Sequence, residues 1–308
     1  MRRRPVSSRR LISVNGDDLT MRDKPSVIPD YRSVVMSLAN VMVYVDPQQQ
    51  EEGQIRVAEA IATRFGASII GVSAFAIEPP FVAEGVVIAE TTKADVDRMQ
   101  ADVAAKEQWF RKVVGLAKEK VEWRWGVEYP TVFLAAQARA ADLVVMKRKQ
   151  LGEDYYHYID SAEAMLRMGR PILSVPDGMT ELSADRIVVG WKDTREARLA
   201  VHDALPFLAR ASRVTVVELC TSDQQDAARL RVRDVANYLE RHGAHCQCEV
   251  RVHTAEADAR YLIRFAREER ADLIVTGGYG HSRLGEWMFG GMTRGLLQEA
   301  PICLMMSH

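Results

Sequence analysis

The sequence contains an internal repeat, and this repeat constrains the fold more than any other feature. The segment ADLVV at residues 141–145 returns as ADLIV at residues 271–275. In both copies a proline follows 29 residues after the aspartate, at Pro171 and at Pro301, so the two copies match at a constant offset of 130 residues. A repeat of this kind indicates that one folding unit has been duplicated within the chain. We therefore expect two similar halves.

The distribution of apolar residues predicts the class of fold. Continuous runs rich in Val and Ile alternate with amphipathic helical segments, which is typical of buried parallel strands connected by crossover helices. In the first half we expect strands at residues 41–46, 68–74, 121–127, 142–147 and 171–175. In the second half we expect them at residues 186–191, 213–219, 246–252, 272–277 and 301–306. The predicted fold class is α/β, with two tandem doubly wound domains, each with a mostly parallel five-stranded sheet flanked by helices.

Helices are expected between these strands, at residues 54–65, 161–168, 195–208 and 292–298. The first half also carries EPPFVAEGVVIAETT after its second strand, which we interpret as a surface excursion, followed by a long helix near residues 94–120. Trp123 and Trp125 alternate on the third strand, so they share one face and are expected to pack beneath helices.

The domain boundaries follow from the same pattern. Residues 36–177 form the first predicted domain, residues 178–185 a short turn-rich linker, and residues 186–308 the second domain. Residues 1–35 are rich in arginine and are interpreted as a disordered basic tail, with a nucleic-acid-binding arm as the alternative. The two halves should be held close together, because the linker is too short for a loose tether.

Charge and hydropathy exclude several classes of partner. The chain has 41 Lys and Arg against 42 Asp and Glu, so it lacks the field that attracts nucleic acid or anionic lipid. No stretch reaches the roughly 18 apolar residues that a membrane span needs, and the start does not resemble a secretory signal. The four cysteines show no paired metal-site spacing and are expected to be reduced thiols. Cys246 and Cys248 share one face of a predicted strand and are expected to be buried there as small apolar residues, with a redox pair or half a metal site as the alternative. A cytoplasmic protein without metal, membrane or nucleic acid is predicted.

One motif carries chemistry. After the fourth strand of the second half the sequence reads TGGYGHSRLGEWMFGGMTR from residue 276 to residue 294, with Gly277, Gly280 and Gly290 at spacings of three and ten. Glycines after a strand let the backbone approach a phosphate, and the start of the following helix offers unpaired N–H groups to the anion. This pattern predicts a phosphate seat at the carboxyl ends of the strands, where doubly wound sheets bind ligands.

The frame of this motif, G-x-x-G, nine residues, then G, resembles the nucleotide loop of the ATP-binding universal stress proteins. Together with five strands in each half, the resemblance covers about residues 37–307 and points to a tandem universal stress protein. It implies that ATP or ADP, if any cofactor, would bind in the second domain. The implied nucleotide-binding residues are Gly190, Trp191, Lys192, Thr276, Gly277, Tyr279, Gly280, His281, Arg283, Gly290, Gly291, Met292 and Thr293. For His281 and Arg283, a solvated loop is an equally good interpretation.

The second half departs from the family pattern at two positions. Lys192 stands where the ATP-binding members have an aspartate that recognises the adenine side, which weakens the expectation of adenine recognition. Gly291 stands where they have Ser or Thr, which removes a phosphate-binding hydroxyl, and Thr293 is a partial substitute.

The first half departs in the opposite way. Asp46 stands at the position of the adenine-recognising aspartate, but at offset 130 the three glycines are replaced by Lys147, Gln150 and Asp160, with Ser161 retained. A negative charge at Asp160 opposes an incoming phosphate, and this residue is a natural cap for its own helix. Nucleotide binding is therefore not expected in this half.

Three functions remain open. The first is a non-enzymatic stress-response sensor or binding module that acts through an unknown protein partner. The second is a ligand-free dimerisation scaffold, and the third is an adenine-nucleotide hydrolase. Catalytic residues are not predicted, because the nearby candidates Asp193, His281 and Glu286 have no spacing that forms a site. The final strands of the two halves are expected to pair within the chain, with a homodimer of whole chains left open.

Overall fold

The computed structural model describes residues 37–77, 81–83, 86–89, 91–148, 158–252, 259–278 and 291–308. The chain divides into the units Met1–Val35 and Met36–His308. The basic segment 1–35, for which we predicted disorder, lies outside the described residues. All the residues that the structure describes belong to the second unit.

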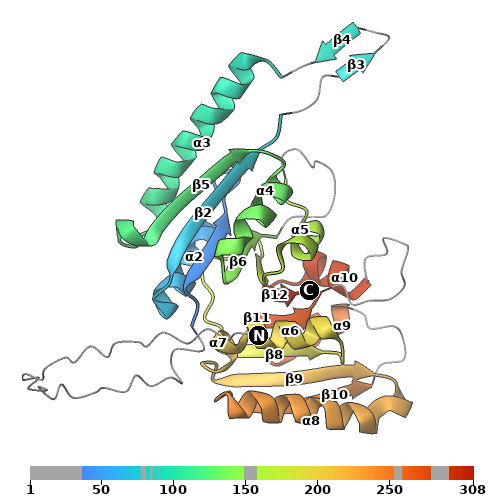
Figure 1. Ribbon diagram of the computed structural model, residues 1–308. Helices are drawn as coiled ribbons and strands as arrows, with labels where there is room; N and C mark the ends of the chain where they lie inside the picture. Colours follow the sequence, from blue (N-terminus) through green and yellow to red (C-terminus); the bar gives the residue numbers. More distant parts are fainter. Residues whose placement is uncertain are drawn as a thin grey trace, which may run out of the picture. The chain divides into compact units, whose positions relative to one another are not determined.

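Ten of the described strands form one sheet, in the order β10-β9-β8-β11-β12-β7-β6-β1-β2-β5 (Figure 1). The first half supplies β1 (Asn40–Tyr44), β2 (Ser68–Phe75), β5 (Val121–Val127), β6 (Leu143–Lys147) and β7 (Ile172–Val175). The second half supplies β8 (Arg186–Trp191), β9 (Arg213–Cys220), β10 (Cys246–Val252), β11 (Leu273–Gly277) and β12 (Cys303–Ser307). Within each half all neighbouring strands are parallel. The predicted α/β class and the ten strands are confirmed, with ends that differ by two residues at most.

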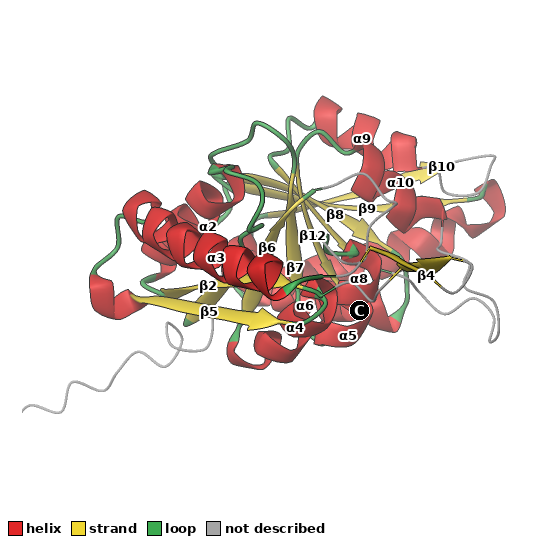
Figure 2. Cartoon of the chain, turned by 90° about the horizontal axis from the view of Figure 1, so that it is seen from above, coloured by secondary structure: helices red, strands yellow, loops and turns green. Residues whose placement is uncertain are grey.

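Helices cover both faces of this sheet (Figure 2). The described helices are α2 (Gly53–Phe65), α3 (Lys93–Val113), α4 (Pro130–Gln137), α5 (Ser161–Met168), α6 (Arg195–Asp203), α7 (Leu205–Leu208), α8 (Gln225–Arg241), α9 (Ala259–Glu268) and α10 (Gly291–Glu299). Two hydrophobic clusters result, one beneath α2, α3, α6, α7 and α8 and the other beneath α4, α5, α9 and α10. Strand residues with full burial, such as Val41 and Met42, point alternately into the two clusters. The predicted surface excursion contains a separate hairpin, β3 (Phe81–Ala83) with β4 (Val86–Ala89).

The repeated aspartates explain why the sequence repeat is detectable. Asp142 accepts a hydrogen bond from the backbone N–H of Ala39 at 2.7 Å, just before β1. Asp272 accepts one from the backbone N–H of Asp185 at 2.9 Å, just before β8. Asp142 therefore fastens the start of β1 to the start of its neighbour β6, and Asp272 fastens the start of β8 to the start of its neighbour β11.

The constant offset of 130 is wrong for the final strands. Val145 lies opposite Leu173, whereas Val275 lies opposite Met305, two residues further along than the offset predicts. Helix α10 has nine residues where α5 has eight, which accounts for one of these two residues. Pro171 and Pro301, which have the same spacing in sequence, are therefore not structurally equivalent.

The two halves join where β7 pairs with β12 in antiparallel orientation, with Ser174 opposite Leu304. The predicted pairing of the final strands within the chain is confirmed by this register. Arg148, which is 8% exposed, crosses the join and donates to the carbonyl oxygens of Ser174 and Ile302, both at 3.1 Å, and to that of Ala300. Burial lowers the pKa of Arg148 to about 10. In the described part of the chain, the strand pair β7–β12 and the buried cation Arg148 join the two halves, and the rings of Phe65 in α2 and Phe207 in α7, with centroids 5.2 Å apart, add a further contact.

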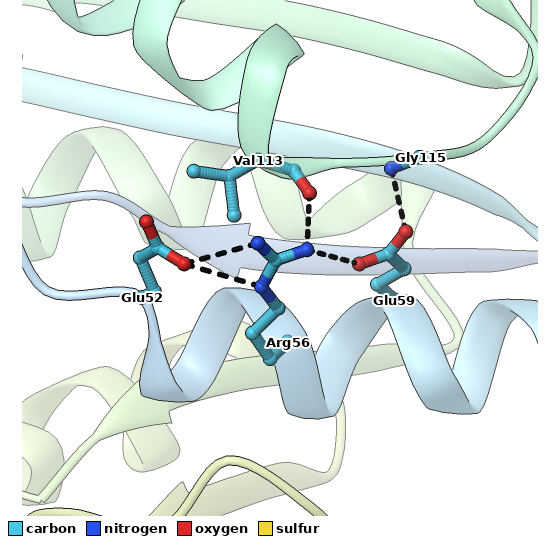
Figure 3. Close-up of polar contacts among 5 residues, drawn as sticks. All are labelled: Glu52, Arg56, Glu59, Val113 and Gly115. Atoms are coloured by element: carbon cyan, nitrogen blue, oxygen red, sulfur yellow. Dashed lines mark hydrogen bonds and ion pairs between the residues drawn. The ribbon is translucent and has the colours of Figure 1, made fainter.

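Two predicted helices need correction. The helix expected at 94–120 ends at Val113, because α2 holds its end: Arg56 donates to the carbonyl oxygen of Val113 at 2.6 Å, and Glu59 accepts from the N–H of Gly115 at 2.5 Å (Figure 3). The helix expected at 195–208 is broken between α6 and α7. Pro206, which has no N–H to donate to the preceding turn, stands at the start of α7.

The prediction for the tryptophans is half right. Trp123 packs against Phe110 of α3, with ring centroids 5.3 Å apart. Trp125 is 43% exposed, because β5 is an edge strand, although its ring stacks on Phe75.

Candidate functional site

The topology creates one crevice in each half. β8 has β9 on one side and β11 on the other, and the helices that follow β8 and β11, α6 and α10, cover opposite faces of the sheet. Ligands of doubly wound sheets bind outside the carboxyl ends of two such strands. In the second half these ends carry Gly190 and Thr276, which lie opposite each other. In the first half the equivalent strands are β1 and β6.

The sequence-predicted site residues that the structure describes gather at the second-half crevice. Gly190, Trp191 and Lys192 end β8 or follow it, Thr276 and Gly277 end β11, and Gly291, Met292 and Thr293 open α10. Tyr279, Gly280, His281, Arg283 and Gly290 lie outside the described residues. The three segments that the motif needs are thus the end of one strand, the end of its neighbour and the start of a helix.

Thr276 and Gly190 fasten the floor of this crevice. The hydroxyl of Thr276 donates to the carbonyl oxygen of Gly190 at 3.1 Å, which links β11 to β8. A side chain at Gly190 would place its Cβ 2.7 Å from Leu262 of α9. These contacts make both residues structural parts of the crevice floor.

Gly277 allows a helix to come close. A Cβ at this position would lie 2.6 Å from the backbone nitrogen of Ala197 and 2.7 Å from the carbonyl carbon of Glu196, both in the first turn of α6. We interpreted Gly277 as room for a phosphate, and the described contact shows that packing of α6 already requires a glycine here. The motif alone could not reveal this contact, because it joins residues about 80 positions apart.

The end of β8 places one cation in solvent. Lys192 is exposed, and its carbonyl oxygen accepts from the N–H of Thr194 at 2.7 Å. Thr194 in turn caps α6 through a hydrogen bond from Ala197 N–H at 3.3 Å. Trp191 is buried, and its indole N–H has no hydrogen-bond partner among the described residues.

The start of α10 divides its residues between the solvent and the core. Gly291 is exposed, and a Cβ there would meet nothing within 4 Å. Met292 packs against the hydrophobic cluster beneath α10. Thr293 lies on the buried face with Leu296 and Leu297, so its position does not favour the expected substitution for the missing hydroxyl at Gly291.

The first-half crevice has a different chemistry at the same positions. Val43 lies opposite Val145 as Val189 lies opposite Val275, so Asp46 takes the place of Lys192 and Lys147 the place of Gly277. Asp46 is 7% exposed.

The two other charged positions of the first half are bound locally. Lys147 pairs with Glu51 and with Asp177, the latter at 3.2 Å. Burial alone would lower the pKa of Lys147, but these two carboxylates outweigh it and raise the pKa. Asp160 caps α5, as predicted, by accepting from Ala162 N–H at 2.8 Å.

A small pocket opens at this first-half crevice. It is lined by Tyr44, Asp46, Gln49, Glu51, Gln54, Met146, Lys147 and Ile159. Sequence reasoning singled out only Asp46 and Lys147 of these. Tyr44 could have been noticed as the one polar side chain inside the apolar run VMVYV, but its hydroxyl environment depends on residues from other elements.

Other chemistry finds little support among the described residues. Cys220, Cys246, Cys248 and Cys303 are free thiols, and burial raises the pKa of both Cys246 and Cys303 to about 12, which makes them poor nucleophiles. Groups of three or more potential metal ligands are absent from the described ranges. Asp193 is exposed and pairs with Arg198, while His281 and Glu286 lie outside the described residues. None of the helices that the structure describes has the length and apolarity of a membrane crossing.

Comparison with known proteins gives a family match for part of the chain. Residues 183–308, in the second half, match the model of the universal stress protein family. A universal stress protein from Archaeoglobus fulgidus DSM 4304 has 12% sequence identity and a TM-score of 0.65, over 88% of this chain and 96% of that one. A protein of unknown function from Pseudomonas aeruginosa PAO1 has 14% identity and a TM-score of 0.55, over 89% and 93% of the two chains. At these identities the likeness shows the fold, which both halves share. A search of curated proteins finds no match.

Proposed function

We propose that this chain is a non-enzymatic binding module of the universal stress protein family, which takes ATP or ADP at the second-half crevice. The supporting observation is that the ends of β8 and β11 lie side by side in the half that matches the family, and that α10 is the next described element after β11. Residues 36–177 and 186–308 would be its two domains, joined by residues 178–185, and the cytoplasm its compartment.

One described side chain and the start of α10 favour an anion in this crevice. Lys192 is exposed at the end of β8, and α10 begins at Gly291 with backbone N–H groups that have no partner within the helix. The start of a helix carries about half a positive charge, which favours phosphate. Gly280 and Gly290 would let the loop backbone close on the phosphates.

Binding without turnover follows from the same residues. Hydrolysis needs a positioned acid, base or metal beside the phosphates. Asp193, the described candidate, is committed to Arg198 in solvent. We therefore expect negligible hydrolysis, and rapid metal-dependent hydrolysis that is lost in Asp193→Asn or His281→Ala would instead support the hydrolase hypothesis.

The ligand-free scaffold is the second candidate, and one observation favours it. Gly277 is required by the packing of α6, so at least one glycine of the motif has a reason to be there without any phosphate. Such a scaffold would act only by holding the two halves together, through the antiparallel pairing of β7 with β12.

Extraction and titration separate these candidates. Freshly purified full-length protein should release ATP or ADP on denaturation, and calorimetric titration with ATP should give one site per chain. Gly280→Val should abolish this binding, because a branched side chain keeps the backbone away from the phosphates. Gln150→Val, at the matched position of the first half, should leave ATP affinity unchanged. An empty extract together with no ATP heat would support the scaffold.

A gain of function sharpens the test. Gly291→Ser should raise ATP affinity about three- to tenfold, because the site has room for the side chain and a hydroxyl adds a hydrogen bond of about 1 kcal/mol. Ser161→Gly, the reverse change at the matched position of the first half, should not alter ATP affinity. A serine at 291 without effect would mean that α10 does not touch the ligand.

A further inference from the structure

The pocket at the first-half crevice is small and lies outside the proposed nucleotide site. It has room for a group about as large as a water molecule, and it opens at the carboxyl ends of β1 and β6. Its walls come from the two strands, from the segment between β1 and α2, from the first turn of α2 and from Ile159.

Tyr44 places a buried hydroxyl group in the wall of this pocket. Its side chain is 6% exposed and lines the pocket, yet its hydroxyl oxygen has no hydrogen-bond partner among the described residues. Buried hydroxyl groups in folded proteins nearly always have a partner. Burial, with a smaller contribution from Asp46, raises the pKa of Tyr44, so the group stays a neutral phenol that can both accept and donate.

The charges that surround the pocket favour a cation. Asp46 and Glu51 line it, and the ammonium group of Lys147 at its edge is already held by Glu51 and Asp177. Lys106 approaches from α3, where its ammonium group donates to the carbonyl oxygen of Gln49 at 2.9 Å. Among the described residues, the carboxylates of Asp46, Glu51 and Asp177 thus lie near the ammonium groups of Lys147 and Lys106, and Asp46 also accepts from the backbone N–H of Gln48 at 2.9 Å.

Among the described residues, the start of α5 does not offer its N–H groups to an anion. The helix start that receives phosphate in the second-half proposal is capped in this half by the carboxylate of Asp160. A phosphate would have to displace this carboxylate from the N–H groups of Ala162 and Glu163 and would then lie against its charge.

The remaining walls are apolar. Met146 is fully buried in β6, and Ile159 is half-buried before α5. An ammonium group is about as large as a water molecule and has N–H donors for Asp46 and Tyr44, while methylene groups behind it would contact Met146 and Ile159. We propose that the first-half pocket binds the primary ammonium end of a small alkyl di- or polyamine.

Putrescine is the probe for this proposal. Calorimetric titration of the full-length protein with putrescine should give one site that persists at physiological salt. Asp46→Asn should weaken this binding at least tenfold, and Tyr44→Phe, which removes only the hydroxyl, should weaken it about threefold to tenfold. Glu249→Gln, which removes a carboxylate from the exposed strand β10, is the matched control and should leave the affinity unchanged.

Three outcomes would overturn the proposal: no heat with putrescine, binding that Glu249→Gln weakens as much as Asp46→Asn, or ATP binding that Asp46→Asn abolishes. The first would leave the pocket to water, the second would indicate nonspecific surface attraction, and the third would place a phosphate ligand in the first half. Circular dichroism of each variant checks that the fold is kept. Failure of this test would not affect the ATP titration with Gly280→Val, because the two sites share no residue.

Discussion

The two halves arrange five strands in the same order, but they fill the crevice at the strand ends with opposite chemistry. In the second half Gly277 lets the first turn of α6 approach within van der Waals contact, and Lys192 supplies a positive charge. In the first half Lys147 occupies the glycine position and is held by carboxylates, and Asp46 replaces the lysine. Equivalent positions in a duplicated fold therefore keep their place in the sheet while the charges at them change.

The join between the halves is asymmetric as well. Arg148 follows β6 and crosses to the carbonyl oxygens of the other half, whereas the equivalent residue after β11 is Gly278. Met165 of α5 fills the space where a side chain at Gly278 would lie. The first half thus supplies Arg148 and Met165 at this join, and the second half leaves space for Met165 at Gly278.

The largest effect is expected at the glycine position. Gly277→Ala should lower the free energy of unfolding by about 3 kcal/mol, because the new Cβ would overlap backbone atoms of α6 that cannot move aside cheaply. Lys147→Ala, at the matched position of the first half, should lower the free energy of unfolding by less than about 1 kcal/mol, since it removes only partly exposed ion pairs. Urea denaturation of both variants measures the difference, and equal losses would contradict the assignment of Gly277 to helix packing.

Arg148 tests the join. Arg148→Met keeps most of the buried volume but leaves the carbonyl oxygens of Ser174 and Ile302 without this donor, so we expect a loss of about 2 kcal/mol. Arg148→Lys should recover part of this loss, because an ammonium group can reach fewer acceptors than a guanidinium group. Unchanged stability in Arg148→Met would mean that the strand pairing and the other contacts between the halves hold them together without this cation.

The sequence predicted the elements well where the signal was local. Strands such as β1 were found because Val41 to Val43 form a continuous apolar run, and α5 was found with both of its ends because Asp160 precedes it and Gly169, in the left-handed conformation, follows it. The end of α3 was missed because Arg56 and Glu59, more than 50 residues away, hold it.

The sites were less predictable for the same reason. Spacing alone located the second-half crevice, but it could not reveal that α6 occupies the space beside Gly277. The first-half pocket depends on the burial of the Tyr44 hydroxyl and on the ion pairs of Lys147, which are properties of the folded chain. A motif search looks for residues that a known ligand needs, and it passes over a site whose charges have changed.

The smallest effect is expected at Asp160, the helix cap in the first half that has a glycine at its matched position in the second half. Asp160 accepts from the N–H groups of Ala162 and Glu163, at 2.8 and 3.1 Å, in the place where the second half has Gly290. Asp160→Ala should lower the free energy of unfolding by about 1 kcal/mol, whereas Asp160→Gly should cost only a few tenths, because glycine leaves the helix start open to water. Thermal unfolding of both variants distinguishes a cap from a residue without a structural role, since the latter would give two equal and negligible losses. If Asp160→Gly also created a second ATP site per chain in the calorimeter, the aspartate alone would be what closes the first half to phosphate. We expect no second site, because Lys147 and Gln150 still replace the two other glycines.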